Sequence, residues 1–259
     1  MSQTLKIVAD GDSWFDYPKI LGSGGGLIDH LETVSGLSIS NYAHRGDSTL
    51  EALGLKKSQR LEKVLAGADI LLFSGGGDDI VGDQLCLGVN QFEDVFGDVT
   101  KAVNQDWLAA ELAVVIANFE DLVKLRDRIS PECWIVIHSY DFPDASMMGK
   151  GVGWFNCVAG PWIQPGMIYC GWRDTKAMAD IIKEMLLALK TAYTGFAAVN
   201  YKVKHVDFQG TLGSGDWDNE IHANGGGWHK LAQVMNLALL PLLDLPATTL
   251  AAASGQPTQ

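Results

Sequence analysis

The sequence predicts a single α/β domain, a doubly wound, flavodoxin-like parallel sheet of about five strands with helices on both faces. Short apolar runs alternate with longer stretches of helical spacing, and parallel neighbours need such crossover connections. The composition, 47% hydrophobic and 19% charged over 259 residues, is sufficient for a large buried core. No composition shift or fixed repeat marks an internal boundary, so the domain is expected to span residues 1–246, followed by a disordered tail at 247–259.

Each expected element follows from the spacing of its apolar residues. Strand-length runs closed by Gly, Ser or Asp occur at residues 5–9, 37–42, 70–73, 134–137 and 203–206. Helical spacing is clearest over 108–128, 175–194 and 228–243, with shorter candidates at 27–34 and 58–65. Strands and helices therefore alternate along almost the whole chain.

Two segments do not fit this alternation, namely residues 80–105 and 144–172. The second is unusually apolar for a loop because it combines glycines with two methionines and five aromatic residues: Met147, Met148, Trp154, Phe155, Trp162, Tyr169 and Trp172. We expect it either to cover a binding site or to complete the core beneath a long connection. Under the first interpretation, Trp14, Trp154 and Trp162 are candidate substrate-binding residues.

Charge and targeting features exclude several classes of partner. The 31 acidic against 19 basic residues give a net charge of −12, which argues against nucleic acid as a ligand. No secretory signal or apolar stretch long enough to span a membrane is present, so a cytoplasmic protein without a membrane span is expected. The four cysteines, Cys86, Cys133, Cys157 and Cys170, are widely spaced, as is typical of free thiols rather than of zinc sites. The oligomeric state is left open by these features.

Polar residues gather directly after the predicted strands, where ligands bind in an open α/β sheet. Ser13 follows the first strand and is a candidate nucleophile, provided that a base reaches it. His222, which follows the last strand and a glycine-rich loop, is the best candidate for that base. Gly46 and Gly77 lack a Cβ, so their backbone can approach a substrate closely and donate an N–H to an oxyanion.

These motifs resemble those of the SGNH (GDSL-type) hydrolases, and they occur in the order that the family shows. Gly11-Asp12-Ser13 matches the family's first motif, Gly46 its second, and His222, which precedes the last helix, its histidine. The resemblance extends from residue 5 to about residue 228. It implies that Ser13 is the nucleophile, that His222 is the general base, and that the N–H groups of Ser13 and Gly46 form an oxyanion hole.

The chain departs from the family pattern at two positions. Asp78 stands where the family has an asparagine that donates to the oxyanion, and an ionised carboxylate cannot donate. A raised pKa would keep Asp78 protonated and able to donate, whereas otherwise Ser13 and Gly46 act alone. Asn219 stands where the family commonly has the aspartate that orients the histidine; it can fix the tautomer without supplying charge. Asp218 and Glu220 are adjacent alternatives for this role.

The resemblance implies a serine esterase that cleaves a small-molecule carboxylic ester through an acyl-enzyme on Ser13, without a metal or organic cofactor. A first alternative is a metal-dependent phosphoesterase that uses Asp10, Asp12, Asp78, Asp79 and His222 as ligands. A second is a catalytically weak or non-catalytic homologue that binds an ester or a sugar.

Overall fold

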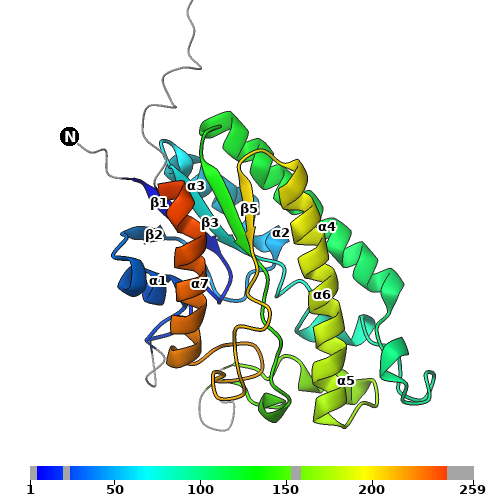
Figure 1. The fold of residues 1–259 in the computed structure, drawn as a ribbon. Helices are drawn as coiled ribbons and strands as arrows, with labels where there is room; N and C mark the ends of the chain where they lie inside the picture. Colours follow the sequence, from blue (N-terminus) through cyan, green and yellow to red (C-terminus); the bar gives the residue numbers. More distant parts are fainter. Residues whose placement is uncertain (1–4, 20–23, 153–158, 244–259) are drawn as a thin grey trace, which may run out of the picture.

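A single parallel sheet with the strand order β2-β1-β3-β4-β5 forms the centre of the molecule (Figure 1). The structure, a computed structural model, describes residues 5–19, 24–152 and 159–243. The strands are β1 (Ile7–Gly11), β2 (Ile39–Asn41), β3 (Ile70–Ser74), β4 (Trp134–His138) and β5 (Val203–Val206). Each predicted strand is present, and the order is that of flavodoxin-like folds, which confirms the predicted fold class.

The helices form a layer on each face of the sheet (Figure 1). On one face α1 (Leu27–Ser35) packs against α7 (Gly225–Leu243), and on the other α4 (Gln105–Ile129) contacts α3 (Leu55–Leu65) and α6 (Thr175–Val199). Two short helices that the periodicity did not indicate are α2 (Thr49–Ala52) and α5 (Gln164–Tyr169). Within the described residues, no helix is long and apolar enough to cross a membrane.

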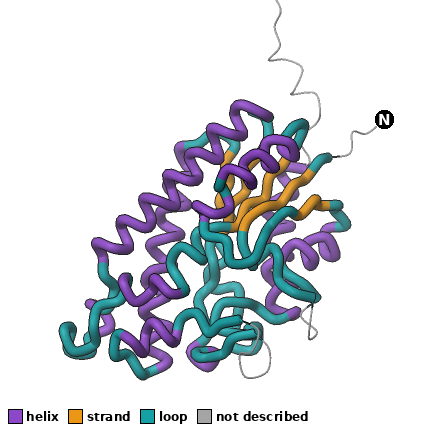
Figure 2. The backbone as a smooth tube through the Cα atoms, turned by 180° about the vertical axis from the view of Figure 1, so that it is seen from behind, coloured by secondary structure: helices purple, strands orange, loops and turns teal. Residues whose placement is uncertain are grey.

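The central strands are buried on both faces because helices cover both sides of the sheet. Every residue of β1 and β3 is buried, whereas the edge strand β2 exposes two of its three residues. Loops gather at the carboxyl end of the strands (Figure 2). This end of the sheet is where the structure brings the candidate site residues together.

Gly11 ends β1 in a conformation that only glycine adopts readily. Its φ is +132°, and a Cβ at this position would lie 1.9 Å from the carbonyl oxygen of Ser74 on the neighbouring strand. The Asp12 N–H then donates to the same Ser74 oxygen at 3.1 Å. The close approach of β1 and β3 at this point turns the chain sharply into Asp12 and Ser13.

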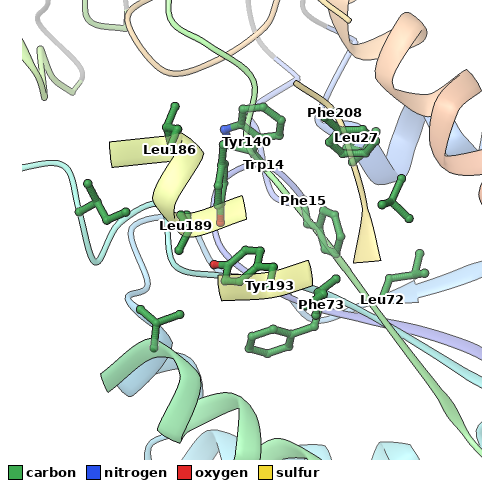
Figure 3. Close-up of a cluster of buried hydrophobic side chains, with 14 of the residues drawn as sticks. Trp14, Phe15, Leu27, Leu72, Phe73, Tyr140, Leu186, Leu189, Tyr193 and Phe208 are labelled. Atoms are coloured by element: carbon green, nitrogen blue, oxygen red, sulfur yellow. The ribbon is translucent and has the colours of Figure 1, made fainter. Parts of the chain in front are cut away.

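The residues after Ser13 anchor this turn in the hydrophobic core. Trp14 and Phe15 are buried, and Figure 3 shows them among aromatic and aliphatic side chains from several elements, including Tyr140, Leu186 and Phe208. The Trp14 ring stacks on His138 and meets the Tyr140 ring edge-on, with centroids 5.5 and 4.9 Å apart. Ser13 is therefore held by packing directly behind it.

The two irregular segments are built differently. Residues 80–105 contain two 3-10 turns, η1 (Asp83–Leu87) and η2 (Val99–Lys101). The segment 144–172 includes η3 (Ala145–Met147) and α5. Its Trp172 is 1% exposed and packs on Phe92, as expected of a core residue, while Trp162 packs edge-on against His222. The role of the segment as a cover of a binding site stays a prediction. Trp154, Phe155 and the tail at 247–259 lie outside the described residues.

Glu220 ties the segment 144–172 to the loop that carries His222. Its fully buried carboxylate accepts hydrogen bonds from the backbone N–H groups of Gly149, Trp162, Ile163 and Gln164, at 2.6 to 2.9 Å. Charge-assisted bonds of this kind are the strong ones, and they also satisfy N–H groups at the start of α5. The Glu220 carboxylate is therefore a main anchor of this segment at the loop that carries His222.

We expect Glu220→Gln to lower the free energy of unfolding by about 3 kcal/mol, because the new amide NH₂ group faces backbone N–H groups that lose their acceptor. Denaturant unfolding measures this loss. Glu93→Gln, on an exposed side chain, serves as the control and should stay within about 0.5 kcal/mol of the wild type. A loss below about 1 kcal/mol in Glu220→Gln would contradict this account of the anchor.

Candidate active site

Ser13, His222 and Asn219 form a hydrogen-bonded series at the carboxyl end of the sheet. The Ser13 Oγ lies 2.8 Å from His222 Nε2, and His222 Nδ1 lies 3.0 Å from Asn219 Oδ1. All three residues are buried. Ser13 is 209 positions from His222 in the sequence, and the fold brings the three residues into the order nucleophile, base and orienting group.

The hydrogen bonds around Asn219 determine which histidine nitrogen carries the proton. Asn219 Oδ1 also accepts from the backbone N–H groups of Ile221 and His222, at 3.1 and 3.0 Å, so the amide oxygen faces the histidine. His222 Nδ1 must then donate to this oxygen, which leaves Nε2 unprotonated toward Ser13. This is the tautomer that a general base requires.

Burial keeps His222 neutral. Desolvation lowers the pKa of its imidazole to about 3, well below the ordinary histidine value. The ring is enclosed by Tyr17 and Trp162, whose centroids lie 4.5 and 5.2 Å from its own. At neutral pH the side chain is therefore ready to accept the Ser13 proton.

A tight turn before α7 positions His222. The backbone N–H groups of Asp218 and Asn219 donate to the His222 carbonyl oxygen, and Trp217 pairs with Ala223 across the turn. Asn224 then accepts from Gly226 N–H and Gly227 N–H at the start of α7. The turn and the helix start fix the direction in which the imidazole leaves the backbone.

The two neighbours of Asn219 take other partners. The Asp218 carboxylate accepts from the Tyr17 hydroxyl at 2.5 Å, and the Glu220 carboxylate is occupied by the N–H groups of the segment 144–172. Neither carboxylate makes a hydrogen bond with the His222 imidazole among the described residues. Of the three candidates, Asn219 is the one whose side chain contacts the imidazole, and its orienting role stays a prediction.

A cavity of about 40 Å³ opens beside Ser13. Much of its wall is apolar and comes from the turn after β1, from α6 and from the loops around His222: Trp14, Val81, Ile163, Ile182, Leu186 and Trp217. Polar side chains also reach the wall, namely Asp12, Asp78, Tyr140, Asp141 and Glu220. The cavity can take a small, largely apolar group next to the serine hydroxyl.

Two backbone N–H groups near Ser13 have no acceptor within the described part of the chain. They belong to Ser13 itself and to Gly46, which lies in an exposed turn after β2 with a φ of +80°. The loop leading to Gly46 is fastened to the serine turn, since His44 N–H donates to the Gly11 carbonyl at 2.8 Å. Gly46 does not line the cavity, so its predicted role stays a prediction.

Asp78 is one of the residues that line the cavity, and one of its carboxyl oxygens has no partner within the described chain. Its Oδ2 atom is buried and makes no hydrogen bond with the described residues. Burial, followed by repulsion from Asp12 and Asp79, raises the pKa of this carboxyl well above its ordinary value. A protonated Asp78 in this position would have an O–H to donate into the cavity.

The other aspartates of the proposed metal cluster have separate protein partners. Asp10 pairs with Arg60 at 2.9 Å, and Asp79 accepts from the hydroxyl and N–H of Thr49 at 2.7 and 2.8 Å. Asp12 accepts from the Ser74 hydroxyl at 2.6 Å. No group of three or more His, Cys, Asp or Glu side chains among the described residues is arranged to hold a metal ion.

The predicted aromatic residues differ in their placement. Trp14 lines the cavity with part of a ring that is otherwise buried in the core, and its Nε1–H donates to the Ile221 carbonyl at 2.9 Å. Trp162 packs edge-on against His222 and does not line this cavity. Trp154 lies outside the described residues.

Two further histidines follow strands but do not reach the reacting atoms. His44 is exposed and pairs with Asp47. His138 is buried beneath the serine turn, where its Nε2 lies 2.9 Å from the Ser74 hydroxyl, and desolvation lowers its pKa to about 3. His222 is therefore the histidine that contacts Ser13.

Sequence reasoning missed several residues of the site, above all Tyr17, Tyr140 and the cavity-lining residues Ile182 and Leu186 of α6. The two aliphatic residues repeat at the spacing of any buried helix face, so no sequence signal separates them from the core. Tyr17 could have been suspected only from its position four residues after Ser13, one turn along if that segment were helical.

The fold of this chain is similar to that of known hydrolases. No protein-family model and no curated protein matches the sequence. Among solved structures, a lipase from a goat rumen metagenome aligns with a TM-score of 0.57 at 13% identity, over 91% of this chain and 97% of that one. A proposed SGNH hydrolase from Slackia heliotrinireducens aligns at 0.55 and 13% identity, over 92% and 100%.

A carbohydrate esterase of family 3 from Talaromyces cellulolyticus aligns similarly, with a TM-score of 0.54 at 12% identity, over 92% of this chain and 98% of that one. In all three alignments more than nine tenths of both chains are covered. The resemblance that the motifs predicted is thereby confirmed at the level of the backbone, and the chain has the fold of the SGNH hydrolases.

Proposed function

We propose that this protein is a serine esterase that hydrolyses a carboxylic ester through an acyl-enzyme on Ser13. The observation that carries the proposal is the 2.8 Å contact between Ser13 Oγ and the unprotonated Nε2 of His222. Asn219 holds the imidazole in this tautomer. A nucleophile, a base and an orienting group in contact beside a cavity are the arrangement that acyl transfer requires.

In the proposed reaction, Ser13 Oγ attacks the ester carbonyl carbon while its proton passes to His222 Nε2. The tetrahedral intermediate collapses when the imidazolium returns this proton to the alcohol oxygen, and the alcohol leaves. A water molecule, deprotonated by the same nitrogen, then attacks the acyl carbon; His222 Nε2 returns this proton to Ser13 Oγ as the bond from Oγ to the acyl carbon breaks and the acid is released. Each step uses groups that this chain supplies, and none needs a metal or an organic cofactor.

The oxyanion of the intermediate would be held by the N–H groups of Ser13 and Gly46 and by the protonated carboxyl of Asp78. Both N–H groups lack an acceptor within the described chain, and so does Asp78 Oδ2. Preorganised donors of this kind stabilise charge only as it develops. The buried carboxyl thus replaces the side-chain amide that the resemblance implies at this position.

The cavity favours a small acyl group. About 40 Å³ is space for a short chain, and its aliphatic and aromatic wall suits an apolar one. The similar fold of a carbohydrate esterase supports an ester as the substrate. We therefore propose that short acyl chains are preferred.

Hydrolysis of p-nitrophenyl esters of graded chain length tests the proposal. We expect the wild type to turn over the acetyl and butyryl esters faster than the octanoyl ester, because the cavity is small. Ser13→Ala should lower kcat by about 10³-fold or more, because the nucleophile is lost.

The matched control is Ser58→Ala, on the helix α3 and away from the site, which should keep the wild-type rate. A fluorophosphonate should label the wild type and leave Ser13→Ala unlabelled. Full activity in Ser13→Ala would refute the nucleophile. A wild type that is neither labelled nor active would instead indicate a non-catalytic binding protein.

The pH profile tests the role of Asp78. Because the pKa of His222 is depressed, the base stays neutral well below pH 7. The raised pKa of Asp78 instead predicts a loss of activity at higher pH, where this carboxyl ionises. We expect kcat/KM to fall as pH rises through the Asp78 pKa, by on the order of 10²-fold, because the O–H donor becomes a repelling carboxylate.

Asp78→Asn should remove this alkaline fall, because an amide donates at every pH. Asp94→Asn, an exposed aspartate in the segment 80–105, is the control and should keep the wild-type profile. If the alkaline fall persists unchanged in Asp78→Asn, Asp78 is not the titrating donor.

A further inference from the structure

We propose that Tyr17 and Asp218 are positioning residues that act on His222 through Asn219 and link the buried base to a carboxylate at the protein surface. The proposal rests on the proposed function of Ser13 and His222 and adds to it a source of negative charge. It addresses the absence of an aspartate at position 219. A neutral amide by itself provides no charge to stabilise the imidazolium that forms during catalysis.

A continuous series of hydrogen bonds connects the four side chains. Asn219 Nδ2 lies 3.0 Å from the Tyr17 hydroxyl oxygen, which lies 2.5 Å from Asp218 Oδ2. On its other side, Asn219 Oδ1 contacts His222 Nδ1. Tyr17, which follows the turn after β1, therefore joins the residues of the loop before α7 in one series of hydrogen bonds that ends at His222.

Every donor in this series is determined by its neighbours. Two backbone N–H groups fix the Asn219 amide oxygen toward His222, so its NH₂ group faces Tyr17 and donates. The phenol oxygen then accepts from Asn219 and has its own proton free for the Asp218 carboxylate. All donors therefore point the same way: each group, beginning with the imidazole N–H, donates toward the Asp218 carboxylate.

The environment of Tyr17 keeps this arrangement in place. The ring is buried and packs on His222 and Trp228, with centroids 4.5 and 6.0 Å away. Burial and the neighbouring Asp218 raise the pKa of the phenol, so it remains a donor. Asp218 itself is exposed, and its charge therefore costs little desolvation.

Through this series of hydrogen bonds, the solvated carboxylate of Asp218 can act on the buried imidazole of His222. When His222 gains the Ser13 proton, positive charge develops in a desolvated site, as its depressed pKa shows. Hydrogen bonds in series polarise one another, so the Asp218 charge strengthens the Tyr17 and Asn219 dipoles that point at the imidazolium. A buried aspartate at position 219 would do this directly but would have to be desolvated.

Tyr17→Phe removes the hydroxyl while it retains the ring that packs on His222. We expect kcat for the preferred p-nitrophenyl ester to fall about tenfold with KM unchanged, because the transition state alone carries the imidazolium. Asp218→Asn keeps an acceptor for the phenol but removes the charge, and a fall of about threefold is expected. The double variant should be no slower than Tyr17→Phe, because the series is already broken.

The decisive test repeats Tyr17→Phe in a protein that also carries Asn219→Asp. With a carboxylate directly on His222 Nδ1, the remote charge becomes redundant, and Tyr17→Phe should there cost less than about threefold. An equal loss in both backgrounds would overturn the proposal and assign Tyr17 a packing role. Multiplicative losses in the Tyr17→Phe/Asp218→Asn double variant would overturn it as well.

The proton NMR signal of His222 Nδ1–H tests the hydrogen bonds without turnover. We expect this signal to move upfield and to exchange faster with solvent in Tyr17→Phe, and an unchanged signal would overturn the proposal. This readout separates its failure from that of the proposed function, which Ser13→Ala decides. Tyr201→Phe and Asp94→Asn, both on exposed side chains, are the matched controls and should leave kcat and the signal unchanged.

Discussion

The contact between Ser13 Oγ and His222 Nε2 is the interaction on which the arrangement of the molecule depends. It joins residues 209 positions apart, one at the end of the first strand and the other before the last helix. The parallel sheet makes the contact possible, because all strands deliver their following residues to the same edge. Gly11 turns the chain at one side of the contact, and the turn before α7 directs the imidazole at the other.

Burial explains most of the chemistry of this edge. Carboxylates that stay charged in a desolvated site need partners, and the chain supplies them: Arg60 for Asp10 and backbone N–H groups for Glu220 and Asp141. Asp78 differs because its buried Oδ2 atom has no partner within the described chain. The same desolvation lowers the pKa of His222 and raises that of Asp78, and both shifts favour the neutral forms that the proposed reaction uses.

The two departures from the family pattern, at positions 78 and 219, have a common physical explanation. At position 78 a carboxyl stands where the resemblance implies an amide, and at 219 an amide stands where it implies a carboxylate. The chain thus carries no ionised carboxylate in direct contact with His222 among the described residues, while Asp218 remains in solvent at the end of the Tyr17 series. In the proposed arrangement, the carboxylate that acts on His222 stays in solvent, and its effect reaches the imidazole through the Tyr17 and Asn219 dipoles.

The sequence alone determined the strands, the main helices and the residues at the strand ends, because apolar periodicity and strand-end polar residues are local patterns. Ser13, His222 and Asn219 could be predicted for the same reason. Only the tertiary structure decided that Trp172 belongs to the core while Trp162 covers the histidine, and that Tyr17 connects Asn219 to Asp218. Tyr17 lies some 200 residues from Asn219 and Asp218, and the other partners are also distant in sequence, so which side chains meet depends on how the layers pack rather than on any local spacing.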